Sequence, residues 1–96
     1  MAFKYVLGEQ FKTDIIGIYD YVAIHLANPI AAAKLHNNFV SAIENACDFP
    51  RINATYFKYR RIVVNNYLLF YKIDEKAKVL TFYRALYGAM DFDRML

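Results

Sequence analysis

The stretch that decides the fold runs from Tyr56 to Asp91 and reads YFKYRRIVVNNYLLFYKIDEKAKVLTFYRALYGAMD. It contains three apolar runs in which aromatic and β-branched residues dominate: Ile62–Val64, Tyr67–Ile73 and Val79–Leu86. This composition favours strands. Asn65-Asn66 suits a tight hairpin, because asparagine tolerates a left-handed backbone. The stretch therefore predicts three consecutive antiparallel strands, with the middle strand apolar on both faces and central in the sheet.

The residues before this stretch predict a short strand and two helices. An alternating pattern at Phe3–Leu7 predicts an outer strand. From Glu9 to about Leu26, apolar residues recur at steps of three and four, which is the period of one helix face. A second helix is expected from Pro29 to about Cys47, because Asn28 is a good N-cap and proline suits the first helical position. The connection between the helices is short, which predicts an antiparallel hairpin.

These elements have the order β-α-α-β-β-β and belong to the α+β class. The chain has 96 residues, so we expect a single domain over residues 1–96. The simplest arrangement packs the two-helix antiparallel hairpin on one face of a small antiparallel sheet and leaves the other face partly open. After Leu86 we expect a turn and a short helix or tail whose apolar residues need cover: Phe92, Met95 and Leu96.

Composition and charge exclude several classes of protein. No apolar run reaches the roughly 18 residues that a membrane helix needs, and the first residues lack the apolar core of a signal peptide. The single Cys47 forms no internal disulfide. We therefore expect a cytoplasmic protein with no membrane partner. The net charge of +3 permits contact with nucleic acid or with an acidic protein and decides between neither.

Side chains of the usual metal-binding and nucleophilic types are few. His25 and His36 lie on predicted helices without ligand-like partners. Cys47, at a helix end, fits a small core residue better than a nucleophile. The three glycines are isolated and form no phosphate-binding loop. We expect no metal and no cofactor.

Basic and aromatic side chains on the predicted sheet are the remaining candidates for function. Alternation along the first strand of the stretch places Lys58 and Arg60 on one face and Arg61 on the other. In the last strand, Tyr83 and Tyr87 fall on the open face. On that face we expect one of two roles for these tyrosines. They pack at an edge or face a partner, or they stack on nucleic-acid bases.

The same alternation places Arg84 on the face that packs against the helices, with Leu80, Phe82 and Leu86, and puts Ala85 on the open face. A guanidinium between sheet and helix needs a carboxylate. The candidates for that carboxylate are Asp14, Asp20 and Asp91. We therefore expect Arg84 to tie the sheet to a helix.

The pieces that carry a family resemblance are Phe3–Leu7, FKTDIIGIYDYV, the helix between Asn28-Pro29 and Phe49-Pro50, Tyr59-Arg60-Arg61, YLLFYKID and YRALYGAMD. In this order and spacing the chain resembles a RelE/ParE-superfamily toxin of bacterial type II toxin–antitoxin systems. The likeness covers nearly the whole chain. It implies a two-helix hairpin on an antiparallel sheet, in agreement with the patterns above.

The resemblance implies two alternative activities. RelE-like members cut mRNA in the ribosome, with basic residues on the sheet and a basic or aromatic residue near the C-terminus. Lys58, Arg60 and Tyr87 are the candidate catalytic residues for that activity. However, Leu68-Leu69 occupies the stretch where such nucleases carry an arginine, and Gly88-Ala89-Met90 lacks their basic residues.

The run YRR…LLFYKI…YRALYGAM is closer to the ParE-like, plasmid-stabilisation branch, although Tyr87 replaces the histidine of that ending. The resemblance therefore implies a toxin that poisons DNA gyrase and is restrained by an acidic, partly disordered antitoxin. A ribosome-dependent mRNA endonuclease, with the ribosome and mRNA as partners, is the alternative. A degenerate toxin that only binds its antitoxin is a further one. The residues expected to be structural or partner-facing are Arg61, Tyr83, Arg84 and Asp91.

Overall fold

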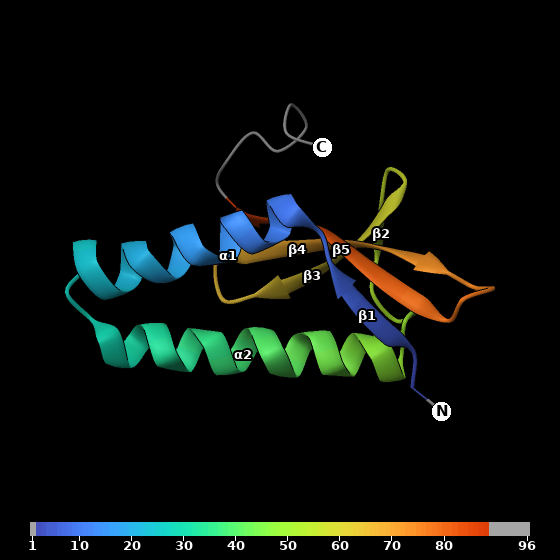
Figure 1. Cartoon of the computed structure of the whole chain (residues 1–96), viewed down its shortest axis with the longest axis horizontal. Helices are drawn as coiled ribbons and strands as arrows, with labels where there is room; N and C mark the ends of the chain where they lie inside the picture. Colours follow the sequence, from blue (N-terminus) through green and yellow to red (C-terminus); the bar gives the residue numbers. More distant parts are fainter. Residues whose placement is uncertain (1, 89–96) are drawn as a thin grey trace.

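The fold is a pair of helices on one face of a five-stranded sheet (Figure 1). The computed structural model describes residues 2–88. Along the chain the elements are β1 (Lys4–Leu7), α1 (Glu9–Asp20), the π-helical turn η1 (Tyr21–His25), α2 (Pro29–Asp48), β2 (Thr55–Tyr56), β3 (Tyr59–Val64), β4 (Tyr67–Asp74) and β5 (Val79–Tyr87). The predicted α+β class and helical hairpin are confirmed. The expected C-terminal helix or tail, with Asp91, Phe92, Met95 and Leu96, lies outside the described residues.

The helical hairpin follows the sequence signals closely. The Asn28 side chain caps α2 by accepting a hydrogen bond from the Ala31 N–H at 3.0 Å. The first helix, predicted to be continuous to Leu26, widens in its last turn to a π-helix, where the Leu26 N–H donates to the Tyr21 carbonyl at 3.0 Å. In Figure 1 the two helices run side by side, and the end where they join extends beyond the sheet.

The sheet is mixed, whereas the sequence predicted an antiparallel one. Its strand order is β1-β5-β4-β3-β2, and β1 runs parallel to β5 from Lys4, which lies opposite Val79. The antiparallel helices return the chain to the start of β1, where the Phe3 N–H donates to the Cys47 carbonyl at 2.9 Å. β3 therefore runs in the same direction as β1. β4 runs opposite to β3, and β5 runs opposite to β4, so β5 is again parallel to β1.

β2 is a short edge strand that the sequence did not predict. Thr55 pairs with Arg60, and Tyr56 pairs with Tyr59. The residues from Arg51 to Thr55 were expected to form a polar loop. Two residues are too few to show a period of two, so the hydrophobic pattern carries no signal for this strand.

β5 contains a bulge. Phe82 pairs with Tyr71 and Arg84 pairs with Phe70, so Tyr83 between them is an extra residue. A bulge leaves one residue unpaired and bends the strand locally.

The bulge reverses the faces of the residues that follow it. Strict alternation predicted Ala85 on the open face and Leu86 toward the helices. In the structure Ala85 belongs to the helix-facing core, and Leu86 packs with Leu68 and Phe70 on the opposite face. Both predictions were wrong, because one extra residue shifts a period-two pattern onto the other face.

The same shift corrects two further predictions. Arg84, expected on the helix-facing side, lies opposite Phe70. Tyr87, expected on the open face, lies beside Tyr67 on the side of α1.

Buried side chains fill both faces of the sheet. The larger cluster lies between the sheet and the helices, and its most deeply buried members are Phe11, Phe39, Ala46, Leu69, Tyr71, Leu80 and Phe82. The smaller cluster contains Leu68, Phe70 and Leu86, with Tyr56 and Tyr59 packed against it. Phe39 and Phe70 are both buried, as predicted. The face expected to be open is therefore partly closed by its own apolar residues.

Candidate functional site

Arg60, a candidate catalytic residue for the nuclease alternative, is engaged with the backbone. Its guanidinium donates from Nη1 to the Arg51 carbonyl at 3.1 Å and to the Asn53 carbonyl at 2.8 Å. These bonds fasten the loop between α2 and β2 to the start of β3. The guanidinium therefore stabilises this loop in the described structure.

The structure does not bring Lys58, Arg60 and Tyr87 together. Lys58 lies in the turn between β2 and β3. Arg60 pairs with Tyr71 in the middle of β4, whereas Tyr87 pairs with Tyr67 at the start of that strand. The offset of four positions between these partners corresponds to about 13 Å at the rise of a strand. Phosphoryl transfer needs its charged and proton-transferring groups around one atom, and these three side chains do not provide that arrangement.

Aromatic rings and cations instead gather on the sheet face away from the helices. Lys72 Nζ lies 5.2 Å from the ring centroid of Tyr59 and 5.1 Å from that of Tyr83. The rings of Tyr59 and Tyr83 meet edge to face with their centroids 5.7 Å apart. We call this set the tyrosine–cation surface, and its members are Tyr56, Lys58, Tyr59, Arg61, Lys72 and Tyr83. The prediction that Lys58 and Arg61 lie on opposite faces was wrong, because Lys58 is in a turn, where strand alternation does not apply.

Each further cation of this surface also lies over a ring. Arg61 Cζ is 5.6 Å from the ring centroid of Tyr56, and Lys58 Nζ is 5.7 Å from that of Tyr59. Within residues 2–88, the ion pairs join Glu9 to Lys12, Arg51 to Glu75, and Asp14 to Arg84. The cations of the surface are therefore not neutralised by carboxylates of the described residues. Lys72 was missed in the sequence, although its two-residue spacing from Phe70 places it on this face.

The turn that joins β2 to β3 has an unusual backbone. Phe57 has a φ of 54°, and 73% of the residue is exposed. Asn65, at the equivalent position of the β3–β4 turn, has the same φ of 54°. Asparagine and glycine suit this conformation, but a bulky side chain there is an outlier and costs about 1–3 kcal/mol. Figure 1 shows this turn projecting from the sheet.

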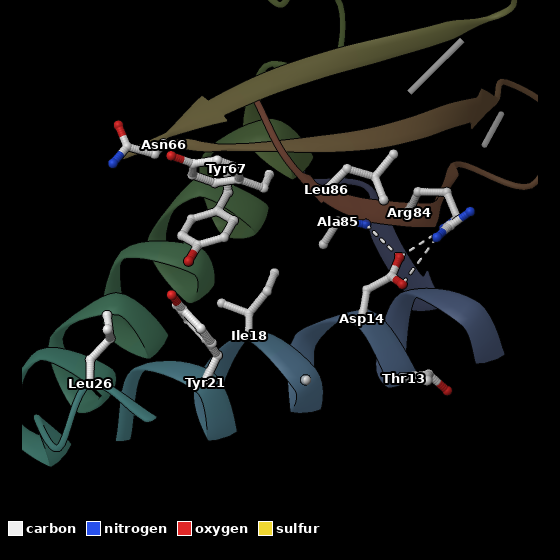
Figure 2. Close-up of a pocket in the computed structure, with 12 residues that line it drawn as sticks. Thr13, Asp14, Ile18, Tyr21, Leu26, Asn66, Tyr67, Arg84, Ala85 and Leu86 are labelled. Atoms are coloured by element: carbon white, nitrogen blue, oxygen red, sulfur yellow. Dashed lines mark hydrogen bonds and ion pairs between the residues drawn. The ribbon is translucent and has the colours of Figure 1, made fainter. Parts of the chain in front are cut away.

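A cleft of about 730 Å³ lies between α1 and the ends of β4 and β5 (Figure 2). From the helical side it is lined by Gly17, Ile18, Tyr21 and Leu26, and from the sheet by Tyr67, Ala85, Leu86 and Tyr87. A Cβ added to Gly17 would meet no atom within 4 Å, so the helix surface is open at this point.

Asp14 closes one end of the cleft and completes the edge of β5. The bonding of β1 to β5 ends where the Gly8 N–H donates to the Phe82 carbonyl at 2.8 Å. Beyond that point the Ala85 N–H donates to Asp14 Oδ2 at 3.0 Å. The carboxylate of α1 thus takes the place of a neighbouring strand.

The predicted contact of Arg84 with a helix carboxylate is present. Arg84 Nε donates to Asp14 Oδ2 at 2.8 Å, and Nη2 donates to Oδ1 at 3.2 Å (Figure 2). The Arg84 side chain is 21% exposed and that of Asp14 is 10% exposed. This two-pronged, partly buried pair has the geometry of a strong Arg–carboxylate interaction. It links β5 to α1, and a purely structural role for Arg84 stays a prediction.

Phenolic groups gather at the other end of the cleft. The Tyr67 and Tyr87 rings lie edge to face with their centroids 5.8 Å apart, and Figure 2 shows the hydroxyls of Tyr21 and Tyr67 directed toward each other. Burial raises the pKa of Tyr67, and the neighbouring Tyr87 and Tyr21 hydroxyls raise it further. The Tyr67 hydroxyl is therefore protonated at neutral pH and can donate a hydrogen bond. This end of the cleft suits binding better than proton abstraction.

The described residues also bear on a cysteine nucleophile and on a membrane-spanning helix. Burial raises the pKa of the Cys47 thiol, and Asp48 and Glu44 raise it further, so this thiol is a poor nucleophile. Within residues 2–88, no helix combines the length and apolar character needed to cross a membrane.

The helical hairpin on this sheet defines the fold of RelE/ParE-superfamily toxins. The family model described as "ParE toxin of type II toxin-antitoxin system, parDE" matches residues 5–92, and the chain belongs to this family. Comparison with curated proteins finds no match.

Two solved structures show the same fold at low sequence identity. The chromosomal ParDE toxin–antitoxin system from P. aeruginosa has a TM-score of 0.73 and 13% identity, over 90% of this chain and 96% of that chain. The toxin–antitoxin complex RelBE2 from Mycobacterium tuberculosis has a TM-score of 0.62 and 14% identity, over 91% of this chain and 99% of that chain.

Proposed function

We propose that this ParE-family toxin arrests growth by binding and poisoning DNA gyrase, and that it lacks RNA cleavage activity. The observation that carries the proposal is the separation of Arg60 from Tyr87 along β4, together with the engagement of Arg60 by loop carbonyls. A surface that binds a protein tolerates this separation. A phosphoryl-transfer site does not, because its groups must act on one phosphate together.

Leu68 supports the same conclusion. It belongs to the Leu68-Leu69 stretch where the nuclease pattern carries an arginine, and it is 8% exposed within the apolar cluster of Phe70 and Leu86. At this point of the sheet the chain has leucine instead of a cation, and the leucine side chain packs against other apolar side chains. Loss of one group that donates to the developing transition-state charge costs about 2.7–4 kcal/mol.

The mRNA endonuclease stays a second candidate because of the tyrosine–cation surface. Arg61 and Lys72 lie on the sheet face away from the helices and have no ion-pair partner within residues 2–88. A negatively charged backbone would be attracted to them. For this candidate, Lys58, Arg60 and Tyr87 stay the predicted catalytic residues.

The test compares the two targets directly. Purified toxin should inhibit supercoiling of relaxed plasmid by purified gyrase, and induced cells should show DNA-damage signalling. Mapping of mRNA ends on translating ribosomes should show no new cleavage. Codon-linked cleavage that disappears in Tyr87→Phe, with gyrase activity intact, would promote the endonuclease and refute the gyrase proposal.

We further propose that an acidic, partly disordered antitoxin restrains the toxin. Apolar side chains are exposed where the helices join, among them Tyr21, Ile24, Leu26 and Ile30. A segment that folds on binding can cover such a surface over a large area. Co-expression with the neighbouring acidic gene product should raise the soluble yield and abolish growth arrest. Antitoxin binding without any growth arrest by the wild-type protein alone would indicate the degenerate-toxin alternative.

A further inference from the structure

Phe57 combines exposure with an unfavourable backbone. Its ring gains little from burial because 73% of the residue is exposed. Its φ of 54° belongs to the region that asparagine occupies at Asn65 in the next hairpin. The β2–β3 turn would therefore be more stable with asparagine or glycine at this position. The phenyl ring contributes too little to the free fold to explain its presence.

We propose that Phe57 docks the toxin onto its target protein by inserting its ring into an apolar pocket that has an acidic rim. The proposal rests on the proposed function in one respect, because it requires a target that is a protein. An exposed aromatic side chain on a short turn loses little conformational freedom when it binds. Phenylalanine, like tyrosine and tryptophan, is enriched at the core of protein interfaces.

The acidic rim follows from charge complementarity. Lys58 is adjacent to Phe57, and Arg61 lies over Tyr56, whose own ring centroid is 4.7 Å from that of Phe57. Lys58 and Arg61 have no ion-pair partner in the part of the chain that the structure describes. Carboxylates around the partner's pocket would supply these partners and would accelerate association.

The cations of the tyrosine–cation surface would attract a nucleic-acid backbone, but the ring contacts of the surface favour a protein over stacked single-stranded bases. Binding of bases by stacking requires free ring faces. Lys72 already lies over the rings of Tyr59 and Tyr83, and those two rings also meet each other edge to face. A base would have to displace these contacts. Phe57, by contrast, is accessible on the projecting turn (Figure 1).

The docking turn is distant from the cleft in Figure 2. Tyr56 pairs with Tyr59 at the start of β3, whereas Tyr67 and Tyr87 line the cleft at the opposite end of the sheet. A substitution at Phe57 should therefore leave the Tyr67–Tyr87 end of the cleft unchanged. This separation allows target binding to be changed without a change in the fold.

The test is Phe57→Asn in the full chain, with Phe57→Gly as a second variant. Asparagine accepts the positive φ, so the thermal unfolding midpoint should stay equal to that of the wild type or rise. The concentration needed to inhibit purified gyrase should rise at least tenfold, and growth arrest should be lost. Ile16→Asn is the matched control, because Ile16 is 60% exposed on α1 and belongs to neither the docking turn nor the surface assigned to the antitoxin. This control should inhibit as the wild type does.

Each other outcome has a defined meaning. Full inhibition by Phe57→Asn, or a lower unfolding midpoint in both variants, would overturn the docking role. Wild-type binding to single-stranded RNA or DNA that Phe57→Asn abolishes would overturn the choice of a protein. If the wild type fails to inhibit gyrase but Phe57→Asn still abolishes growth arrest, gyrase is the wrong target and the docking role stands. Absence of both inhibition and arrest in the wild type would overturn both proposals.

Discussion

At the scale of single residues, one carboxylate serves two kinds of donor. Asp14 accepts from the guanidinium of Arg84 and from the backbone N–H of Ala85, which no strand reaches because β1 has already ended. A partly buried N–H without a partner is costly. Asp14 therefore contributes to the fold both as an ion-pair partner and as a substitute for a strand.

We predict that Asp14→Ala lowers the free energy of unfolding by about 1–3 kcal/mol, because it leaves these donors without their acceptor. Asp20→Ala is the matched control on the same helix, since Asp20 is exposed, and an exposed substitution of this kind changes stability by about 0.5 kcal/mol or less. Denaturant unfolding measures both variants.

Arg84→Met should also lower stability, and should lower toxicity only in proportion to the folded protein. Asp14 would keep the hydrogen bond from the Ala85 N–H but lose the bonds from the guanidinium. A well-folded Arg84→Met variant without toxicity would instead place Arg84 among the functional residues.

At the scale of elements, the sequence predicted those features that short patterns encode. Asn28-Pro29 marked the start of α2, and Asn65-Asn66 marked the β3–β4 turn. The parallel pairing of β1 and the bulge at Tyr83 were not predicted. Both depend on where distant segments meet, and no local period records that.

The candidate site, like the fold, could be predicted only in part from the sequence. The Asp14–Arg84 contact was expected because a guanidinium between sheet and helix needs a carboxylate. The proximity expected of Lys58, Arg60 and Tyr87 came from the family resemblance alone, and the strand register separates Arg60 from Tyr87. The exposed Phe57 was missed because its signal is a backbone angle, which composition does not reveal.

The packing of the helical layer on the sheet gives the clearest prediction at this scale. The Phe39 ring on α2 lies between Tyr19 of α1 and Tyr67 of β4, with centroids 5.9 Å and 5.8 Å away. Phe39→Ala should lower the free energy of unfolding by about 3–5 kcal/mol through lost burial and an added cavity. Val40→Ala, at the partly exposed next position, should cost much less. An unchanged unfolding midpoint for Phe39→Ala would show that the core assignment is wrong.

At the scale of the whole molecule, one buried and two partly buried phenols make stability depend on pH. Burial raises the pKa of Tyr19, Tyr67 and Tyr71 above the ordinary value of 10.0. For Tyr71, the bond from Asn53 and the charge of Arg60 oppose this shift in part. A raised pKa means that the unfolded chain loses its proton first as the pH increases. The contribution to stability is therefore complete below pH 10 and is lost as the pH rises through the folded-state pKa.

We predict that the free energy of unfolding falls as the pH rises above 10, and that Tyr71→Phe reduces the slope of this fall. The Tyr71 hydroxyl donates to the Pro50 carbonyl at 2.6 Å, so ionisation would place a negative charge beside a carbonyl oxygen. At neutral pH the same variant should lose about 1 kcal/mol, the usual contribution of one hydrogen bond. The Cys47 thiol, whose pKa is raised from 9.0, titrates nearby, so the series is measured in a Cys47→Ala background. Tyr83→Phe, at an exposed position, is the control and should keep the wild-type slope. A slope equally steep in Tyr71→Phe would show that other groups cause the alkaline loss.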